Sequence, residues 1–72
     1  MERFTIRSYP FFELAGMYYP DRSPQSALRM FRKELHDTRG LWKALQAVGY
    51  KEYAKVFTRS QVRTIVDFLG PP

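Results

Sequence analysis

The chain has 72 residues, of which 44% are hydrophobic and 17% aromatic, a composition that predicts one globular domain over residues 1–72. It has no cysteine and one histidine, which excludes a disulfide framework, a thiolate zinc site, a cysteine nucleophile and a histidine-rich metal cluster. Twelve Lys and Arg residues against seven Asp and Glu residues give a formal net charge of +5, so nucleic acid is one candidate partner.

The first part of the chain predicts a short strand and a helix. Residues 4–8 alternate between apolar and polar side chains, which is the pattern of a half-buried strand. From Pro10 to Tyr18, apolar residues recur at the spacing of one helix face, with Ser8 as the expected cap. Pro20 ends this segment, because a residue before proline avoids the helical region.

A second helix is predicted from Pro24 to His36. Ser23 is the expected N-cap, and proline is well tolerated at the first helical position. At 100° per residue, two faces separate clearly. The apolar face carries Ala27, Leu28, Phe31 and Leu35, and the opposite face carries Gln25, Arg29, Arg32, Lys33 and His36.

A third helix is predicted over residues 39–48, because Leu41, Ala44, Leu45 and Val48 repeat at helical spacing. Asp37 or Thr38 is the expected cap, and Gly49 stands where a helix commonly ends in the left-handed conformation. Residues 56–57 form a possible second strand, which we expect to pair with the first strand.

The last helix carries the fullest set of local signals. Thr58 and Gln61 match a capping box, and Phe57 and Val62 match the hydrophobic staple that accompanies it. The stripe continues through Ile65, Val66 and Leu69, and Gly70 followed by two prolines stops the helix.

The fold class that follows is mainly α: a compact four-helix domain with a small two-stranded β element, similar to a winged helix-turn-helix. Its predicted core contains Leu14, Phe31, Leu35, Leu41, Leu45, Phe57, Val62, Ile65, Val66 and Leu69. Phe11, Phe12 and Trp42 are also expected in the core, since aromatic side chains beside an apolar stripe are more often packed than exposed.

Positive charge concentrates in the middle of the chain, where residues 22–63 hold ten Lys and Arg residues against three acids. Several cations on one face suit phosphate binding, and Arg or Gln on an exposed helix suits base edges in a major groove. The plainer interpretation is a solvated helix face that keeps the protein soluble. The candidate DNA-binding residues are Gln25, Arg29, Arg32, Lys33, His36, Lys51, Lys55, Arg59 and Arg63.

Other functional classes receive less support. The chain has no pair of acids at a recognisable catalytic spacing and no Gly-rich phosphate loop, so we expect no enzyme and no cofactor. His36 near a helix end has a simple structural role in the field of the helix dipole.

Tyr18, Tyr19, Tyr50 and Tyr53 are either half-buried core residues or part of a protein interface. With no long apolar stretch and no secretory signal, we expect a cytoplasmic protein without membrane association.

Two groups of residues resemble parts of known DNA-binding domains. Residues 13–15, Glu-Leu-Ala, followed by residues 23–29, Ser-Pro-Gln-Ser-Ala-Leu-Arg, are similar to helix-turn-helix sequences. Residues 49–50 followed by residues 57–62 resemble the wing and following helix of MerR-like and excisionase-like winged-helix domains. This resemblance implies that residues 24–36 enter a major groove and that Lys51 and Lys55 belong to a wing.

A longer pattern covers nearly the whole chain. It consists of Ser8-Tyr9, residues 13–15, Tyr18, Pro20, Ala27, Leu45, Gly49-Tyr50, Phe57-Thr58, residues 61–63 and Leu69-Gly70. This pattern resembles a family of short gut-bacterial proteins catalogued as a domain of unknown function. The resemblance implies the fold boundaries and a bacterial origin, but no established activity.

Two functional hypotheses therefore stand at the level of sequence. The first is a small DNA-binding protein, acting as a transcriptional or mobile-element accessory regulator on double-stranded DNA. The alternative is a protein-interaction module that binds a protein partner or forms a homodimer. The distribution of positive potential distinguishes the two hypotheses. Positive charge clustered on one face favours DNA binding, and scattered positive charge favours the interaction module.

Overall fold

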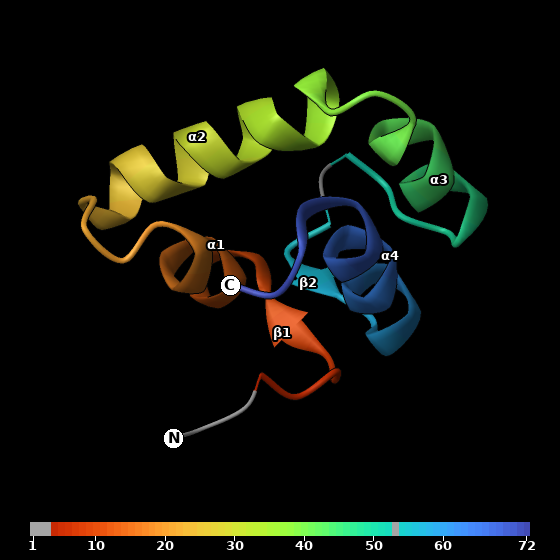
Figure 1. Ribbon diagram of the computed structural model, residues 1–72, viewed down its shortest axis with the longest axis horizontal. Helices are drawn as coiled ribbons and strands as arrows, with labels where there is room; N and C mark the ends of the chain where they lie inside the picture. The colour runs from red at the N-terminus through yellow and green to blue at the C-terminus, as the bar shows by residue number, and fades with distance from the viewer. Residues whose placement is uncertain (1–3, 53) are drawn as a thin grey trace.

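The computed structural model describes residues 4–52 and 54–72. Two short strands and four helices follow one another along the chain (Figure 1). They are β1 (Tyr9–Pro10), α1 (Phe11–Tyr18), α2 (Pro24–Asp37), α3 (Leu41–Ala47), β2 (Val56–Phe57) and α4 (Arg59–Leu69).

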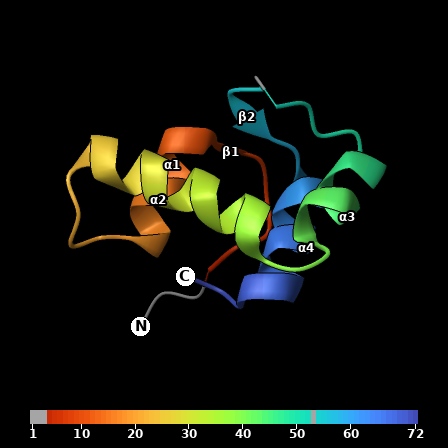
Figure 2. The same cartoon turned by 90° about the horizontal axis from the view of Figure 1, so that it is seen from above.

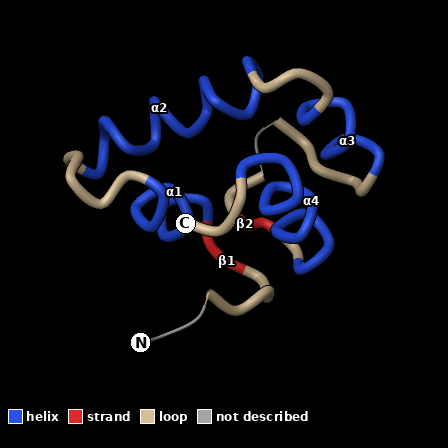
Figure 3. The backbone as a smooth tube through the Cα atoms, viewed as in Figure 1, coloured by secondary structure: helices blue, strands red, loops and turns tan. Residues whose placement is uncertain are grey.

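The helices and the two strands form a compact, mainly helical architecture with a small two-stranded element, as the sequence predicts, and the two strands are antiparallel (Figure 3). Helix α2 lies along the outside, and the view from above shows it running across α1 toward α3 (Figure 2). α1 packs against α2, and α3 packs against α4. Helix α2 has one face free of the rest of the protein, an arrangement that is compatible with a winged helix.

The sheet joins segments that are far apart in the sequence. β1 and β2 pair antiparallel, with Tyr9 opposite Phe57 and Pro10 opposite Val56. This confirms the expected pairing of two distant strands. It also means that β2 pairs with the N-terminal segment and not with a neighbouring strand of a local hairpin.

The position of the first strand differs from the prediction of residues 4–8, which was wrong. The strand is β1 at residues 9–10, because the preceding segment folds back on Tyr9. The Tyr9 hydroxyl donates to the carbonyl of Thr5 at 2.7 Å, and its ring stacks on Phe4 with 5.3 Å between centroids. These local contacts compete with strand pairing for residues 4–8.

The beginning of α1 also differs from the prediction. Pro10 occupies the N-cap position with no side-chain hydrogen bond, so the predicted Ser8 cap was wrong. Instead the amide of Phe11 donates to the carbonyl of Lys55 at 2.8 Å. The Lys55 carbonyl thus provides a partner for one of the backbone amides that the first turn of a helix normally leaves without a hydrogen bond.

Helix α2 begins as predicted. The Ser23 hydroxyl accepts from the amide of Ser26 at 3.3 Å, and Pro24 is the first helical residue. Asp37 is the last helical residue, one beyond the predicted end, and Thr38 donates its amide to the Glu34 carbonyl.

Helix α3 begins at Leu41, two residues later than predicted, so neither Asp37 nor Thr38 caps it. The reason is Gly40, whose φ of 82° lies in the left-handed region, so the chain is not helical at this residue and α3 begins after it. The helix ends at Ala47, one residue before the predicted Val48, and the predicted left-handed conformation of Gly49 is confirmed. The φ of Gly49 is 83°. The amide of Gly49 donates to the carbonyl of Gln46, and the amide of Tyr50 donates to the carbonyl of Leu45, both at 3.0 Å. These bonds form a Schellman motif.

The capping box of α4 is confirmed. The amide of Thr58 donates to Gln61 Oε1 at 2.9 Å, and the amide of Gln61 donates to Thr58 Oγ1 at 3.3 Å. The helix ends at Leu69, before Gly70, as predicted.

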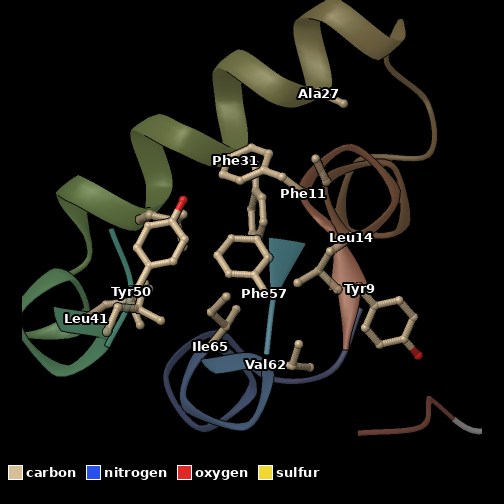
Figure 4. Packing of buried hydrophobic residues seen from close by; sticks show 13 residues of the cluster. Tyr9, Phe11, Leu14, Ala27, Phe31, Leu41, Tyr50, Phe57, Val62 and Ile65 are labelled. Carbon is tan, nitrogen blue, oxygen red and sulfur yellow. The ribbon is translucent and has the colours of Figure 1, made fainter. Parts of the chain in front are cut away.

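The core lies between α2 on one side and α4 on the other, with the rings of Phe31 and Phe57 at its centre (Figure 4). Eight of the ten predicted core residues are buried, while Val66 and Leu69 are only partly buried against the cluster. Tyr50 is buried as a full core residue, stacked on Phe57 at 5.0 Å. The expectation for Phe12 was wrong, since that side chain is 67% exposed.

Among the residues that the structure describes, no helix has the length and apolar character needed to cross a membrane.

Candidate nucleic-acid interface

The outer face of α2 is built by the amphipathic pattern of its sequence. Ala27, Phe31 and Leu35 are buried against the core, so the residues half a turn away face solvent. All five predicted residues of this face are exposed: Gln25, Arg29, Arg32, Lys33 and His36.

Four of these residues surround one shallow depression of about 530 Å³, which we call the basic hollow. Its lining consists of Gln25, Leu28, Arg29, Arg32 and Lys33. It therefore presents three cationic side chains and one amide within three turns of a single helix. This arrangement suits a polyanion that follows the helix, because each cation is held by the same rigid backbone.

A second depression adjoins the first and differs in character. This apolar hollow of about 580 Å³ lies where α1, α2 and the segment before β2 meet. Its lining consists of Phe11, Phe12, Leu28, Arg32, Glu52, Ala54 and Lys55. Leu28 and Arg32 line both hollows, so the two are adjacent parts of one surface.

Arg32 is held at the boundary between the two hollows. Its guanidinium carbon lies 5.3 Å from the centroid of the Phe11 ring, a cation–π contact. Burial raises the pKa of the Tyr50 hydroxyl, while Arg32 lowers this pKa and Glu52 raises it. Arg32 therefore has a packing partner in Phe11 and is less free to follow a ligand than Arg29 or Lys33.

His36 lies near the end of α2 and outside both hollows. Its imidazole stacks on the indole of Trp42 with 3.9 Å between ring centroids. It is also the basic residue of the last turn of α2, where a positive charge interacts favourably with the helix dipole. These contacts give His36 a structural role that joins α2 to α3.

Of the four remaining predicted residues, Lys51, Arg59 and Arg63 line neither hollow. Arg59 and Arg63 are exposed residues of α4, and this helix lies across the core from α2 (Figure 4). Lys51 is exposed in the segment between α3 and β2 and lines neither hollow. Lys55 is the one residue of the predicted wing that the structure brings beside α2, through the apolar hollow.

The cations of the basic hollow are not committed to ion pairs within residues 4–52 and 54–72. The ion pair in this part of the chain joins Arg7 to Glu13 at 3.7 Å, and it lies at the start of α1. Arg29, Arg32 and Lys33 thus keep their charges available to an external anion.

The tyrosines singled out in the sequence have mainly structural roles. The Tyr18 hydroxyl donates to the carbonyl of Gly70 at 2.6 Å, and its ring stacks on Phe31. Burial, and secondarily Tyr19, raises the pKa of Tyr18 to about 12. Tyr50 belongs to the core, and Tyr53 lies outside the described residues.

The described part of the chain contains no group of three or more His, Asp or Glu side chains placed to hold a metal ion. Sequence reasoning missed the apolar hollow, because its walls come from three separate segments. The available signal was the pair Phe11 and Phe12: adjacent residues on a helix point in directions about 100° apart, so one ring of the pair can face the core while the other faces solvent.

The chain matches the family described as a domain of unknown function (DUF4248) over residues 5–72, and it belongs to that family. No curated protein and no solved structure matches the chain.

Proposed function

We propose that the protein binds double-stranded DNA through the basic hollow of α2, as a small cytoplasmic accessory regulator of transcription or of a mobile element. The observation that carries the proposal is the grouping of Arg29, Arg32 and Lys33 with Gln25 on the exposed face of one helix. The side of α2 that bears them is turned away from the core.

The dimensions of α2 fit this role. Its fourteen residues give a length of about 21 Å at about 1.5 Å per residue. The major groove of B-form DNA is about 12 Å wide and admits one helix. Helix α2 lies on the outside of the molecule, so it can approach a groove with α1 behind it (Figure 2).

The four residues divide into two roles by their position along the helix. Gln25 and Arg29 lie nearer the N-terminal end, which in helix-turn-helix proteins contacts base edges. Lys33 lies further along and is placed for phosphate contacts, with Arg32 beside it. Lys55 adds a cation next to α2, whereas Arg59 and Arg63 would require a second DNA contact on α4.

Two substitutions separate these roles on duplex DNA. Lys33→Ala should weaken binding to all duplexes alike and lower the slope of log affinity against log salt by about one unit. Arg29→Ala should cost about 1–3 kcal/mol on a preferred site and less on random DNA. Lys43→Ala, an exposed lysine of α3 outside both hollows, is the matched control. Equal losses in the Lys33 and Lys43 variants would argue for diffuse charge attraction and against α2.

The alternative function is a protein-interaction module. The specific observation in its favour is the exposure of Phe12 at the apolar hollow, because exposed aromatic side chains are enriched at protein interfaces. Protein binding at the apolar hollow and DNA binding at the basic hollow would use different residues, apart from Leu28 and Arg32, which line both hollows.

A further inference from the structure

The apolar hollow is a preformed feature of the fold. Its floor includes Phe11, which is buried in the core, and its rim includes Phe12, which projects to solvent. Leu28 of α2 and Ala54, from the segment before β2, supply the other apolar walls. The backbone bond from the Phe11 amide to the Lys55 carbonyl, at 2.8 Å, fixes α1 and the segment before β2 relative to each other. A ligand would therefore find the walls in place, without a cost for assembling them.

The charges on the rim are unequal. Arg32 and Lys55 are positive and Glu52 is negative, so the rim has an excess of one positive charge. The contact with the Phe11 ring holds the guanidinium of Arg32 at this rim. No carboxylate within the described residues forms an ion pair with Arg32 or Lys55. The hollow thus combines an apolar centre with two cations that form no ion pair with a carboxylate of residues 4–52 and 54–72.

This combination favours one kind of occupant over two others. A second copy of the chain carries the same net charge of +5 and would bring the same rim, with its excess of one positive charge, against this one, at a cost in like-charge repulsion. A nucleic-acid strand would find mainly apolar walls where base edges need polar partners. An acidic peptide places carboxylates on the cations and an apolar side chain in the centre.

We propose that the apolar hollow is a docking site for an acidic segment of a partner protein, with a Leu, Phe or Trp side chain seated against Phe12 and Leu28 and flanking carboxylates paired with Arg32 and Lys55. The partner is defined by this chemistry alone. The site does not depend on DNA binding by α2. Since Arg32 also lines the basic hollow, the acidic segment and duplex DNA should weaken one another's binding.

Capped synthetic peptides with a central Leu, Phe or Trp flanked by Glu on both sides are the probes. We expect binding by fluorescence anisotropy, with amide shifts in ¹⁵N spectra at Phe12, Leu28 and Ala54. Binding should fall by about tenfold in Phe12→Ala, as expected when an aromatic anchor of an interface is truncated. Lys55→Gln should weaken the binding and reduce its salt dependence. Phe68→Ala, which removes another exposed aromatic side chain outside the hollow, should leave the affinity unchanged.

Several results would overturn the docking site. These are no binding by any of the acidic peptides, equal binding by peptides with Lys in place of Glu, or equal affinity in the Phe12→Ala variant with its thermal stability intact. A wild-type dimer that Phe12→Ala converts to a monomer would assign the hollow to a second copy instead. Shifts at the same three amides with a single-stranded oligonucleotide, and none with peptide, would assign it to nucleic acid. Duplex binding by Phe12→Ala is measured in parallel, so failure of the peptide site is distinguishable from failure of the DNA proposal.

Discussion

Gln61 connects two helices through one buried side chain, of which only 4% is exposed. Its Oε1 accepts the amide of Thr58 within the capping box, and its Nε2 donates to the carbonyl of Val48 at 3.1 Å. The same amide group therefore caps α4 and satisfies a carbonyl at the end of α3. Sequence patterns predict the first bond from the spacing of Thr58 and Gln61. They do not predict the second, because it depends on how α3 packs against α4.

The two bonds of Gln61 predict different costs for two substitutions. Gln61→Glu keeps an acceptor for the Thr58 amide but removes the donor to Val48 and brings a negative charge beside that carbonyl. Gln61→Ala removes both bonds. We expect both variants to lower the free energy of unfolding in urea by about 1–3 kcal/mol, the cost of leaving a buried polar group without a partner. Protonation of the new carboxyl restores a donor, so stability of Gln61→Glu should recover at acidic pH relative to Gln61→Ala. Parallel pH profiles for the two variants would contradict the role of the Val48 bond.

Tyr18 gives the protein a dependence on alkaline pH. Its pKa is raised to about 12 from an ordinary value of 10.0, because burial disfavours the phenolate and Tyr19 adds to the effect. Between these two values the unfolded state loses the proton and the folded state keeps it, so stability falls as pH rises from 10 to about 12. Tyr18→Phe should make this fall less steep in urea titrations across that range. Tyr19 and Tyr50 also have raised pKa values, so a smaller slope remains in the variant. An unchanged slope would contradict the assignment.

At the scale of elements, the helices were predictable where their ends are encoded locally. α2 and α4 begin with a Ser23 cap and a Thr58 capping box, and both starts are confirmed. The start of α1 was not predictable, because its first amide bonds to Lys55, which lies far along the chain. The start of α3 was misplaced because Asp37 and Thr38 look like caps, while the left-handed conformation of Gly40 sets the boundary.

The cap of α4 provides a test at this scale. Thr58→Ala should lower the free energy of unfolding by about 1 kcal/mol, as N-cap losses typically do. Thr64→Ala is a control in the same helix, since its hydroxyl donates back to the Ser60 carbonyl at 3.0 Å and caps nothing. Thermal melts of the two variants should therefore separate, with the lower midpoint for Thr58→Ala. Identical midpoints would mean that the capping box contributes no net stability.

At the scale of the whole molecule, the candidate site was partly predictable. Helical periodicity alone places Gln25, Arg29, Arg32 and Lys33 on one face, and the structure gathers them around the basic hollow. Periodicity does not determine how separate helices are arranged. For that reason the sequence groups Arg59 and Arg63 with α2, although they belong to α4, which lies across the core from α2 (Figure 4). The apolar hollow could not be predicted for the same reason, since three segments meet there.

The central claim is that the exposed face of α2 binds double-stranded DNA. The most direct measurement is the affinity of the wild-type protein for a random-sequence duplex across a series of salt concentrations, starting at low ionic strength. We predict binding whose logarithm falls linearly with log salt, with a slope of about −3, because three cations of the basic hollow each release about one counterion equivalent. Absence of any salt-dependent binding at low ionic strength would contradict the claim and leave the protein-interaction module as the better account of this fold.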